Sequence, residues 1–463
     1  MKSLVDPSQA LGAGLQSIRT EFHVPEAFPP EVLAAAEAAA KRVPDSHVDR
    51  TAMPFVTLDP ASSTDLDQAF SIETSGDDIL LHYAIADVAW FVADGDPIDG
   101  EAWNRGETFY LPDGRAGLYP PVLSEGAASL LPEGPRPAII FTVRVGGDGA
   151  VKLDGAERAL IRSRAKLAYD SVQPKDLPDG FDELARRMAE NEKRRGASRV
   201  DPPEQQVERL ANGRYRLAFR PRLKSEADNA ALSLAANMAI ADAMLAHHTG
   251  LFRVMSEPDE ARVKGLRNAA RALGLDWPEA VSLRDYQRTL DPADPQQAAL
   301  MLDIRHAGNG ASYQPYREGE TPWHEAMAAT YAHATAPLRR LADRYVVRCT
   351  LAIANGQPVP QVVTDAFARL PKVMGRADGR ASQIDHAVID LAEAVMLTGR
   401  EGETFQAIVT DFFDNGVRVQ LAGMPVVANI KANGFRQGDK LSVKLVSADP
   451  NQRRVVFDPV PAP

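Results

Sequence analysis

The sequence is poor in cysteine, in positive charge and in long apolar runs, and each shortage excludes a class of protein. The single cysteine, Cys349, cannot form an intrachain disulfide, so the cytoplasm is the expected compartment. No apolar run reaches the roughly 20 residues that cross a bilayer, so we expect no membrane association. The formal net charge of −11 argues against a protein that coats nucleic acid over its whole surface.

Positive charge is nevertheless concentrated in one stretch. Residues 331–380 contain eight Lys or Arg side chains and three acids. The basic residues are Arg339, Arg340, Arg344, Arg348, Arg369, Lys372, Arg376 and Arg380. Such a stretch forms either a solvated helical face or the wall of a channel that binds an anion. The sequence alone leaves both interpretations open.

The 463 residues are too many for one ordinary core and predict two or three domains. Residues 1–45 predict two short helices, either a small appendage or a helix-turn-helix. Residues 46–395 begin with strand-rich runs and turn helical after about 160. Residues 396–463 predict a five-stranded barrel of the oligonucleotide-binding type. The expected fold class is α+β.

The predicted barrel is either a structural cap or a ligand-binding module. Phe412 and Phe413, beside Arg418, are candidates for a platform on which bases stack. The same phenylalanines also suit the hydrophobic core of the barrel.

Three aspartates lie within nine positions of the segment TLDPASSTDLDQAF, between two apolar runs. Asp59, Asp65 and Asp67 have three possible roles. They are turn residues that bond their own backbone, or calcium ligands, or ligands of a hard divalent cation used in phosphoryl chemistry. The calcium loop fails on spacing, because Ala69 and Phe70 stand where a ligand and a glycine are needed.

The surrounding motifs decide between the remaining roles. FVTLDPASSTDLDQAF is followed in order by HYAIADVAWFV, YLPDG, PPVLSEGAASL and YAHATAPLRRLADRY. This series, from about residue 45 to the C-terminus, resembles the ribonuclease II family of 3′-to-5′ exoribonucleases. The first 45 residues do not match the tandem cold-shock domains of the best-known members. The resemblance therefore implies a short form with an RNB-type catalytic domain and a C-terminal S1 barrel.

The resemblance also implies roles for individual residues. Asp59, Asp65 and Asp67 match three metal-binding carboxylates, and Asp67 matches the one on which hydrolysis depends most. Gln68 stands at the fourth metal-ligand position, where a carbonyl brings no charge. Arg339 matches the arginine at the scissile phosphate, and its neighbour Arg340 is a second candidate for contact with RNA. Tyr110 and Tyr169 match aromatic residues at the terminal bases and the ribose. Mg²⁺ is the implied cofactor, with Mn²⁺ as a substitute.

Several positions depart from the family pattern. Ala230 and Ala231 stand where many members have two glutamates linked to recognition of the 3′ end. Ala336 replaces a serine and Leu341 a tyrosine in the arginine turn. Asp87 matches a family position, but we interpret it as structural support rather than as a ligand. Selectivity for RNA over DNA is therefore predicted less firmly than hydrolysis.

The sequence thus predicts Mg²⁺-dependent hydrolysis of single-stranded RNA from the 3′ end, with release of nucleoside 5′-monophosphates. We expect a monomer without an obligate protein partner. Two rivals are an RNA-binding relative disabled by Gln68 and a single-strand nuclease that also accepts DNA.

Overall fold

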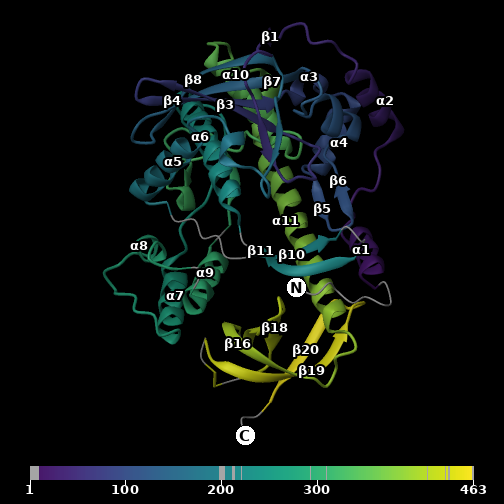
Figure 1. Cartoon of the computed structure of the whole chain (residues 1–463), viewed down its shortest axis with the longest axis vertical. Coiled ribbons are helices and arrows are strands. Elements are labelled where there is room, and N and C mark those ends of the chain that lie inside the picture. Colours follow the sequence, from purple (N-terminus) through teal and green to yellow (C-terminus); the bar gives the residue numbers. More distant parts are fainter. Residues whose placement is uncertain are drawn as a thin grey trace.

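The computed structural model describes residues 10–460, apart from gaps at 198–203, 211–213, 221, 292–293, 309, 414–415, 433 and 436–437. A large lobe contains a five-stranded sheet, and a C-terminal barrel lies at the opposite end of the molecule (Figure 1). Helix α11 (Gln361–Leu397) runs from the large lobe to the barrel and packs against strands of both. The predicted α+β fold with a C-terminal five-stranded barrel is confirmed.

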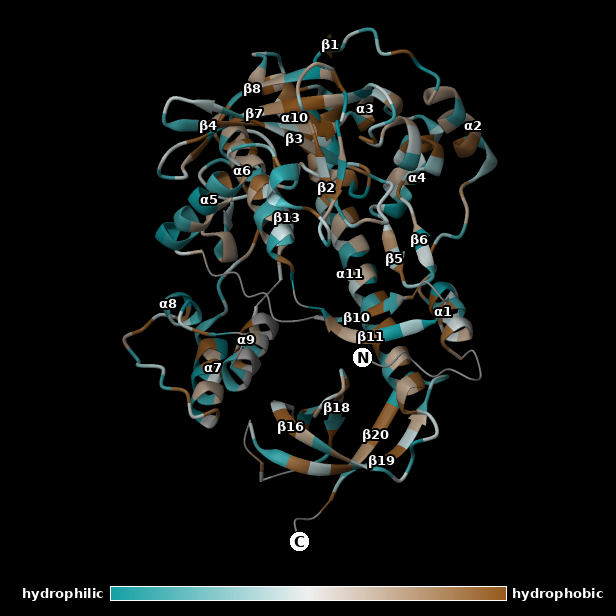
Figure 2. Ribbon diagram, in the orientation of Figure 1, coloured by the Kyte–Doolittle hydropathy of each residue, from teal (hydrophilic) through white to brown (hydrophobic). Residues whose placement is uncertain are grey.

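The sheet of the large lobe has the strand order β1-β8-β7-β4-β3. Its members are β1 (Val48–Asp49), β3 (Gln68–Ser75), β4 (Asp78–Ala86), β7 (Arg136–Val145) and β8 (Val151–Ile161). All pairs are antiparallel except β1 with β8. The central strand β7 is almost entirely buried and hydrophobic (Figure 2). Helices α6 (Lys224–Ala246) and α10 (Leu341–Ala354) pack on β8 and against each other, which explains the apolar character of this part of the chain.

Helix α6 alone among the described residues is long and apolar enough to cross a membrane. However, 67% of its most apolar window is buried inside the protein. Its small and aliphatic side chains belong to the main hydrophobic cluster, so it is a core helix.

Further helices and strands of the large lobe are shorter than α6. They are α3 (Val88–Phe91), α4 (Pro97–Arg105), α5 (Phe181–Arg195), β2 (Thr57–Asp59), β5 (Phe109–Leu111), β6 (Gly114–Ala116), β9 (Lys166–Ala168), β10 (Glu204–Arg209), β11 (Tyr215–Arg220), β12 (Leu251–Val254), β13 (Ser312–Pro315), β14 (Trp323–His324) and β15 (Ala329–Thr330). A separate group of helices, α7 (Glu260–Ala272), α8 (Leu283–Gln287) and α9 (Pro295–Ala307), has its own hydrophobic cluster.

The N-terminal helices α1 (Ala10–Glu21) and α2 (Pro30–Ala39) lie within the two stretches predicted as helical. They join different hydrophobic cores. Helix α1 packs against α11, whereas α2 packs against α4 in the main cluster. The two helices therefore pack against two different parts of the large lobe.

The barrel has the strand order β18-β17-β16-β19-β20, and β18 also contacts β20. Its strands are β16 (Thr404–Phe413), β17 (Gly416–Leu421), β18 (Val427–Ile430), β19 (Lys440–Asp449) and β20 (Arg454–Pro459). The side chains of Phe412 and Phe413 lie outside the described residues, so their predicted stacking role stays a prediction. Helix α11 continues past the predicted domain boundary at 395/396 and ends at Leu397.

Candidate active site

The three aspartates lie on one loop that connects β2 to β3. Asp59 ends β2, which pairs in parallel with β9, and Asp67 immediately precedes β3. The loop is anchored by Leu66, which is fully buried and whose N–H donates to Ser129 Oγ at 2.8 Å. Ser129 Oγ in turn donates to the Thr64 carbonyl at 2.8 Å. Because side chains alternate in an extended segment, burying Leu66 directs Asp65 and Asp67 to the other side.

Asp67 is a buried carboxylate that is 5% exposed. Its Oδ1 accepts a hydrogen bond from the Leu338 N–H at 2.6 Å, and its Oδ2 accepts one from Arg339 Nε at 3.3 Å. Burial raises the pKa of Asp67 to about 7, although Arg339 and the Leu338 N–H act in the opposite direction. The loop from β2 and the arginine turn before α10, 272 positions apart, thus meet at this carboxylate.

Asp59 is also desolvated. Burial raises the pKa of Asp59 to about 6; Asp65 adds to the rise, while Arg339 and Lys166 oppose it. Its Oδ2 atom is buried and has no hydrogen-bond partner among the described residues. A buried carboxylate oxygen without a donor is costly unless a cation completes its surroundings.

Asp65, like Asp67, has a donor on each of its oxygens, but its arginine lies closer, at 2.5 Å rather than 3.3 Å. Arg115 Nη1 donates to Oδ1, and the Tyr110 hydroxyl donates to Oδ2 at 3.2 Å. Tyr110 and Arg115 are cross-strand partners in the β5–β6 hairpin. One hairpin therefore holds Asp65 with two side chains.

Gln68 lies at the start of β3, and its Oε1 accepts a hydrogen bond from the Tyr83 hydroxyl at 2.6 Å. Its carbonyl is thus already engaged by a buried phenol, and its role as a metal ligand stays a prediction. Asp87 is engaged away from the aspartate loop. It caps α3 through the Trp90 N–H and contacts His47 Nε2 at 3.2 Å and Arg158 Nε at 2.7 Å, which agrees with a supporting role.

The two adjacent arginines have opposite environments. The Arg339 side chain is 44% exposed and contacts Asp67, so its guanidinium is accessible beside the carboxylates. Arg340 donates to both oxygens of Asp343 at 2.9 and 2.8 Å, and Asp343 is fully buried. Asp343 Oδ1 also accepts from the Ala336 N–H at 2.8 Å, so this pair shapes the turn that presents Arg339.

Both predicted tyrosines lie near the aspartates. Tyr110 is 49% exposed although its hydroxyl reaches Asp65, which leaves much of its side chain accessible. Tyr169 follows β9, and its hydroxyl accepts from Asn229 Nδ2 of α6 at 2.9 Å. Burial and the nearby Asp59 carboxylate raise the pKa of Tyr169 to about 12, so it is a neutral hydrogen-bonding group.

The basic stretch 331–380 does not form one anion-binding wall. Arg340, Arg344 and Arg348 are paired with Asp343, Asp99 and Asp94. Arg369 and Arg380 lie over the rings of Trp103 and Phe109. Most of this charge therefore holds helices and hairpins together, and Arg339 is the residue that reaches the aspartate loop.

The donor set fits a hard divalent cation with few protein ligands. Asp59 and Asp67 offer desolvated carboxylate oxygens, one of them without a partner. In the described part of the chain, no three His, Cys, Asp or Glu side chains converge into a ready-made metal cage. Mg²⁺ tolerates this, because it retains several waters and completes its shell with substrate phosphates. Asp59 and Asp67 are therefore the residues that would hold it.

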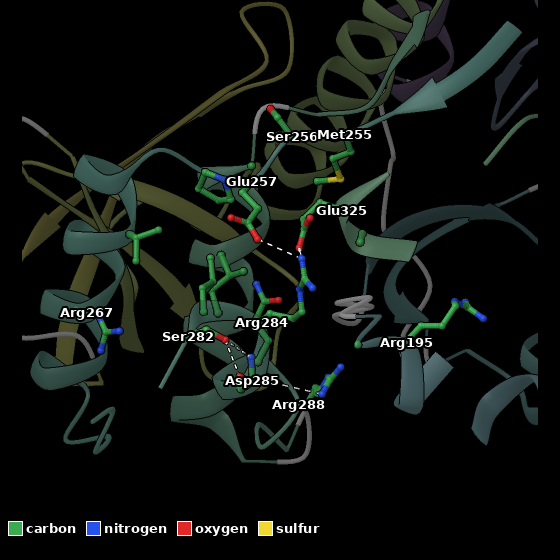
Figure 3. Close-up of a pocket in the computed structure, with 18 of the residues that line it drawn as sticks. Arg195, Met255, Ser256, Glu257, Arg267, Ser282, Arg284, Asp285, Arg288 and Glu325 are labelled. Carbon is green, nitrogen blue, oxygen red and sulfur yellow. Dashed lines mark hydrogen bonds and ion pairs between the residues drawn. The ribbon is translucent and has the colours of Figure 1, made fainter. Parts of the chain in front are cut away.

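A cavity of about 750 Å³ lies elsewhere, between the end of α5, the α7–α9 group and the residues that follow β12 and β14 (Figure 3). Five arginines and three carboxylates line it. Arg284 binds both Glu257 and Glu325, and Arg288 contacts Asp285 at 3.4 Å. Arg267 donates to the Val281 carbonyl at 2.7 Å. These arginines are used within the protein, so we do not place the chemistry here.

Sequence reasoning missed Arg115, Ser129 and Asn229. Ser129 lies in the quoted motif PPVLSEGAASL, and Asn229 directly precedes Ala230 and Ala231, but only the fold shows that they hold the aspartate loop and Tyr169. Arg115 belongs to none of the motifs that carried the family resemblance. Its position opposite Tyr110 in a hairpin with the turn PDG was the available clue.

Comparison with known proteins gives a consistent result over most of the chain. Residues 47–355 match the RNB domain, and residues 403–460 match the RNase II-type exonuclease C-terminal S1 domain. Ribonuclease R of Aquifex aeolicus is 26% identical over 498 aligned positions, which cover 95% of this chain and 69% of the relative.

Solved structures share the fold. Mycoplasma genitalium RNase R in complex with ribose methylated single-stranded RNA matches with a TM-score of 0.86 at 19% identity, over 99% of this chain and 79% of that one. Yeast Ssd1, a pseudonuclease, matches with a TM-score of 0.68 at 14% identity, over 97% of this chain and 58% of that one. The fold by itself therefore does not determine whether a chain hydrolyses RNA. That question has to be argued from the residues of the site.

Proposed function

We infer that this chain, which belongs to the RNB-domain family, degrades single-stranded RNA from the 3′ end and releases nucleoside 5′-monophosphates. The family resemblance predicted from the sequence is confirmed. Relatives of the ribonuclease R and ribonuclease II type are exoribonucleases that hydrolyse phosphodiester bonds, and the chain is a hydrolase of this class. The direction of degradation along the RNA, the nucleoside 5′-monophosphate product and the metal ion are our proposals.

The observation that carries the proposal is the meeting of Asp59, Asp67 and Arg339. Two desolvated carboxylates lie beside an exposed guanidinium that one of them orients. We propose that Asp59 and Asp67 hold Mg²⁺, or Mn²⁺ in its place. When bound, such an ion supplies a polarised phosphate and a more acidic water.

The protein's own residues supply position and charge. Arg339 faces the phosphate and neutralises charge that grows on its oxygens as water attacks and the 3′-oxygen leaves. Its bond to Asp67 orients the guanidinium before the substrate arrives. We propose that Asp65, held by the β5–β6 hairpin, fixes the loop that carries Asp59 and Asp67.

We propose that two aromatic residues hold the RNA. The exposed Tyr110 lies beside Asp65 and can stack on a terminal base. The Tyr169 hydroxyl, held by Asn229, can contact the terminal ribose. We propose no RNA contact for Arg340 beyond shaping the turn, because Asp343 occupies its guanidinium. We expect the chain to act as a monomer in the cytoplasm.

One experiment tests the function. A 5′-labelled RNA strand and a DNA strand of the same sequence are incubated with the protein and Mg²⁺, with EDTA as the control. We expect the RNA to shorten from the 3′ end, and mass spectrometry to identify nucleoside 5′-monophosphates. An RNA strand that stays intact with both Mg²⁺ and Mn²⁺ would favour the RNA-binding rival, and equal loss of the DNA would favour the unselective nuclease.

A further inference from the structure

Arg115 is a charged residue beside the aspartates for which the proposed function has no use. It lies on β6, and its side chain is 25% exposed. Its Nη1 contacts Asp65, and its Nη2 contacts Glu125 Oε1 and Thr64 Oγ1, each at 2.7 Å. Glu125 Oε2 accepts from Thr64 Oγ1 at 3.0 Å, so Arg115, Thr64 and Glu125 form a closed network to which Asp65 is joined through Arg115. Arg115 is thus fixed by partners on two sides.

The network changes what Asp65 can do. With Arg115 on one oxygen and the Tyr110 hydroxyl on the other, Asp65 already has a cation and a neutral donor. A second cation on the same carboxylate would be repelled by the guanidinium at contact distance. Asp59 has the opposite character, since its buried Oδ2 lacks a partner among the described residues. Asp67 also has an arginine and an N–H on its oxygens, but Arg339 is 44% exposed and lies 3.3 Å away, whereas Arg115 lies 2.5 Å from Asp65 and is held by Glu125 and Thr64. Arg339 can therefore move aside for a metal ion more easily than Arg115 can, and the carboxylates on this loop are not equivalent metal ligands.

Gln68 points to the same asymmetry. Its amide carries no charge, and its carbonyl oxygen is engaged by the Tyr83 hydroxyl at 2.6 Å. Of the four predicted ligands, Asp65 is thus a carboxylate that already carries a guanidinium, and Gln68 is a neutral amide that already carries a hydroxyl donor. Neither is well suited to a second divalent ion.

We propose that Arg115 is a built-in cation that takes the place of a metal ion on Asp65, so that the chain binds one divalent ion, held by Asp59 and Asp67. The inference rests on the proposed function for the identity of the metal ligands. Arg115 is a positioning residue, because it acts through Asp65. Its contacts with Asp65, Thr64 and Glu125 keep the loop in place when no metal is bound.

The test measures metal binding directly, without RNA. Mn²⁺ is titrated into the full chain, and free Mn²⁺ is followed by electron paramagnetic resonance. We expect the wild type to bind one equivalent. Arg115→Met should bind a second equivalent or bind the first on the order of tenfold more tightly, because one positive charge has left. Arg115→Lys, which keeps the charge, should stay close to the wild type.

Two further variants serve as controls for this interpretation. Glu125→Gln removes the carboxylate that shares Arg115, so the guanidinium opposes Mn²⁺ more strongly and affinity should fall, opposite in direction to Arg115→Met. Arg144→Met is the matched control, because Arg144 also joins two carboxylates, Asp78 and Asp154, but lies at the far end of β7. It should leave Mn²⁺ binding unchanged. If Arg115→Met does not fold, Glu125→Gln alone decides.

Two equivalents of Mn²⁺ in the wild type, or identical binding by wild type, Arg115→Met and Glu125→Gln, would overturn the proposal. The proposed function fails by a different result, namely absence of RNA hydrolysis with any divalent ion. A wild type that degrades RNA and binds two ions would overturn only the role of Arg115.

Discussion

The aspartate loop and the cavity between α5 and the α7–α9 group both contain arginines and carboxylates, but these side chains are paired differently in the two regions. In the cavity, Arg284 is bound to Glu257 and Glu325, and Arg267 to a backbone carbonyl. At the aspartate loop, Asp59 keeps an unpartnered buried oxygen among the described residues, and Arg339 stays 44% exposed. The cavity therefore holds arginines whose terminal nitrogens are mostly taken by carboxylates and carbonyls of the protein, although the buried Arg284 Nε has no partner among the described residues. The aspartate loop instead combines an unpartnered carboxylate oxygen with an accessible guanidinium, and this combination is a better guide to phosphoryl chemistry than the volume of a cavity.

The strongest test of this comparison pairs one substitution from each region. Asp67→Asn should abolish hydrolysis while RNA binding, measured by fluorescence anisotropy, stays nearly intact, because the stacking and phosphate contacts remain. Arg284→Met in the cavity should leave the rate of hydrolysis near that of the wild type and lower the melting temperature instead.

More than about a tenth of wild-type turnover in Asp67→Asn, a loss below roughly 1.4 kcal/mol of barrier stabilisation, would contradict the assignment of the site. A loss of turnover in Arg284→Met at unchanged stability would mean that the cavity takes part in the reaction.

The second test compares two adjacent arginines. Arg339 has an accessible guanidinium, whereas Arg340 is paired with a carboxylate, as Arg284 is in the cavity. Arg339→Ala should lower turnover about 10²–10³-fold with little change in RNA affinity or stability, since it acts on developing charge. Arg340→Ala leaves the buried Asp343 without its partner, and should cost roughly 3–5 kcal/mol in the free energy of unfolding. Single-turnover kinetics and urea unfolding separate the two effects. The assignment is reversed if Arg340→Ala is the slower enzyme while fully folded.

The third test concerns Gln68. It belongs to the aspartate site by sequence, but its side chain is partly buried and already hydrogen-bonded, like the paired groups of the cavity. Gln68→Glu keeps the acceptor for Tyr83 and adds a charge. We expect a several-fold lower Mg²⁺ concentration for half-maximal rate, measured at constant ionic strength so that screening is held fixed. Asp87 does not already supply this charge, because its partners are His47, Arg158 and the α3 N-terminus. An unchanged or higher Mg²⁺ requirement would place Gln68 outside the metal's reach.

The smallest effect is expected at Glu393, a buried carboxyl outside both regions. Burial raises the pKa of Glu393 to about 7, much as for Asp67, yet its Oε1 accepts from Gln205 Nε2 at 2.7 Å and the Val427 N–H at 2.8 Å. It joins α11 to the barrel. Between about pH 4.5 and 7 the folded state holds a proton that the unfolded chain has released, so the free energy of unfolding decreases as pH rises through this window.

Glu393→Gln removes this titration while keeping the acceptor oxygen. Its melting temperature relative to the wild type should therefore rise between pH 5 and pH 8, by about 1–3 °C. A difference that does not vary with pH would show that Glu393 does not titrate in this range. Activity should not change, since a raised pKa alone does not mark a catalytic group.

The order of motifs in the chain was enough to predict the family, the α+β lobe, the C-terminal barrel and the candidate residues Asp59, Asp65, Asp67 and Arg339. These are local features: each motif is contiguous, and alternating apolar residues reveal strands and helices without knowledge of their partners. Helices α1 and α2 were likewise predicted from their own composition.

Only the tertiary structure decided how these groups are used, because a side chain's role depends on neighbours that are distant in sequence. Asp65 and Asp67 are two positions apart and chemically identical, but one meets Arg115 of the β5–β6 hairpin and the other meets Arg339 of the turn before α10. Arg339 and Arg340 are adjacent, and only the buried Asp343 separates their roles. Burial and pairing, which set pKa and charge, arise when the chain folds and leave no local trace in the sequence.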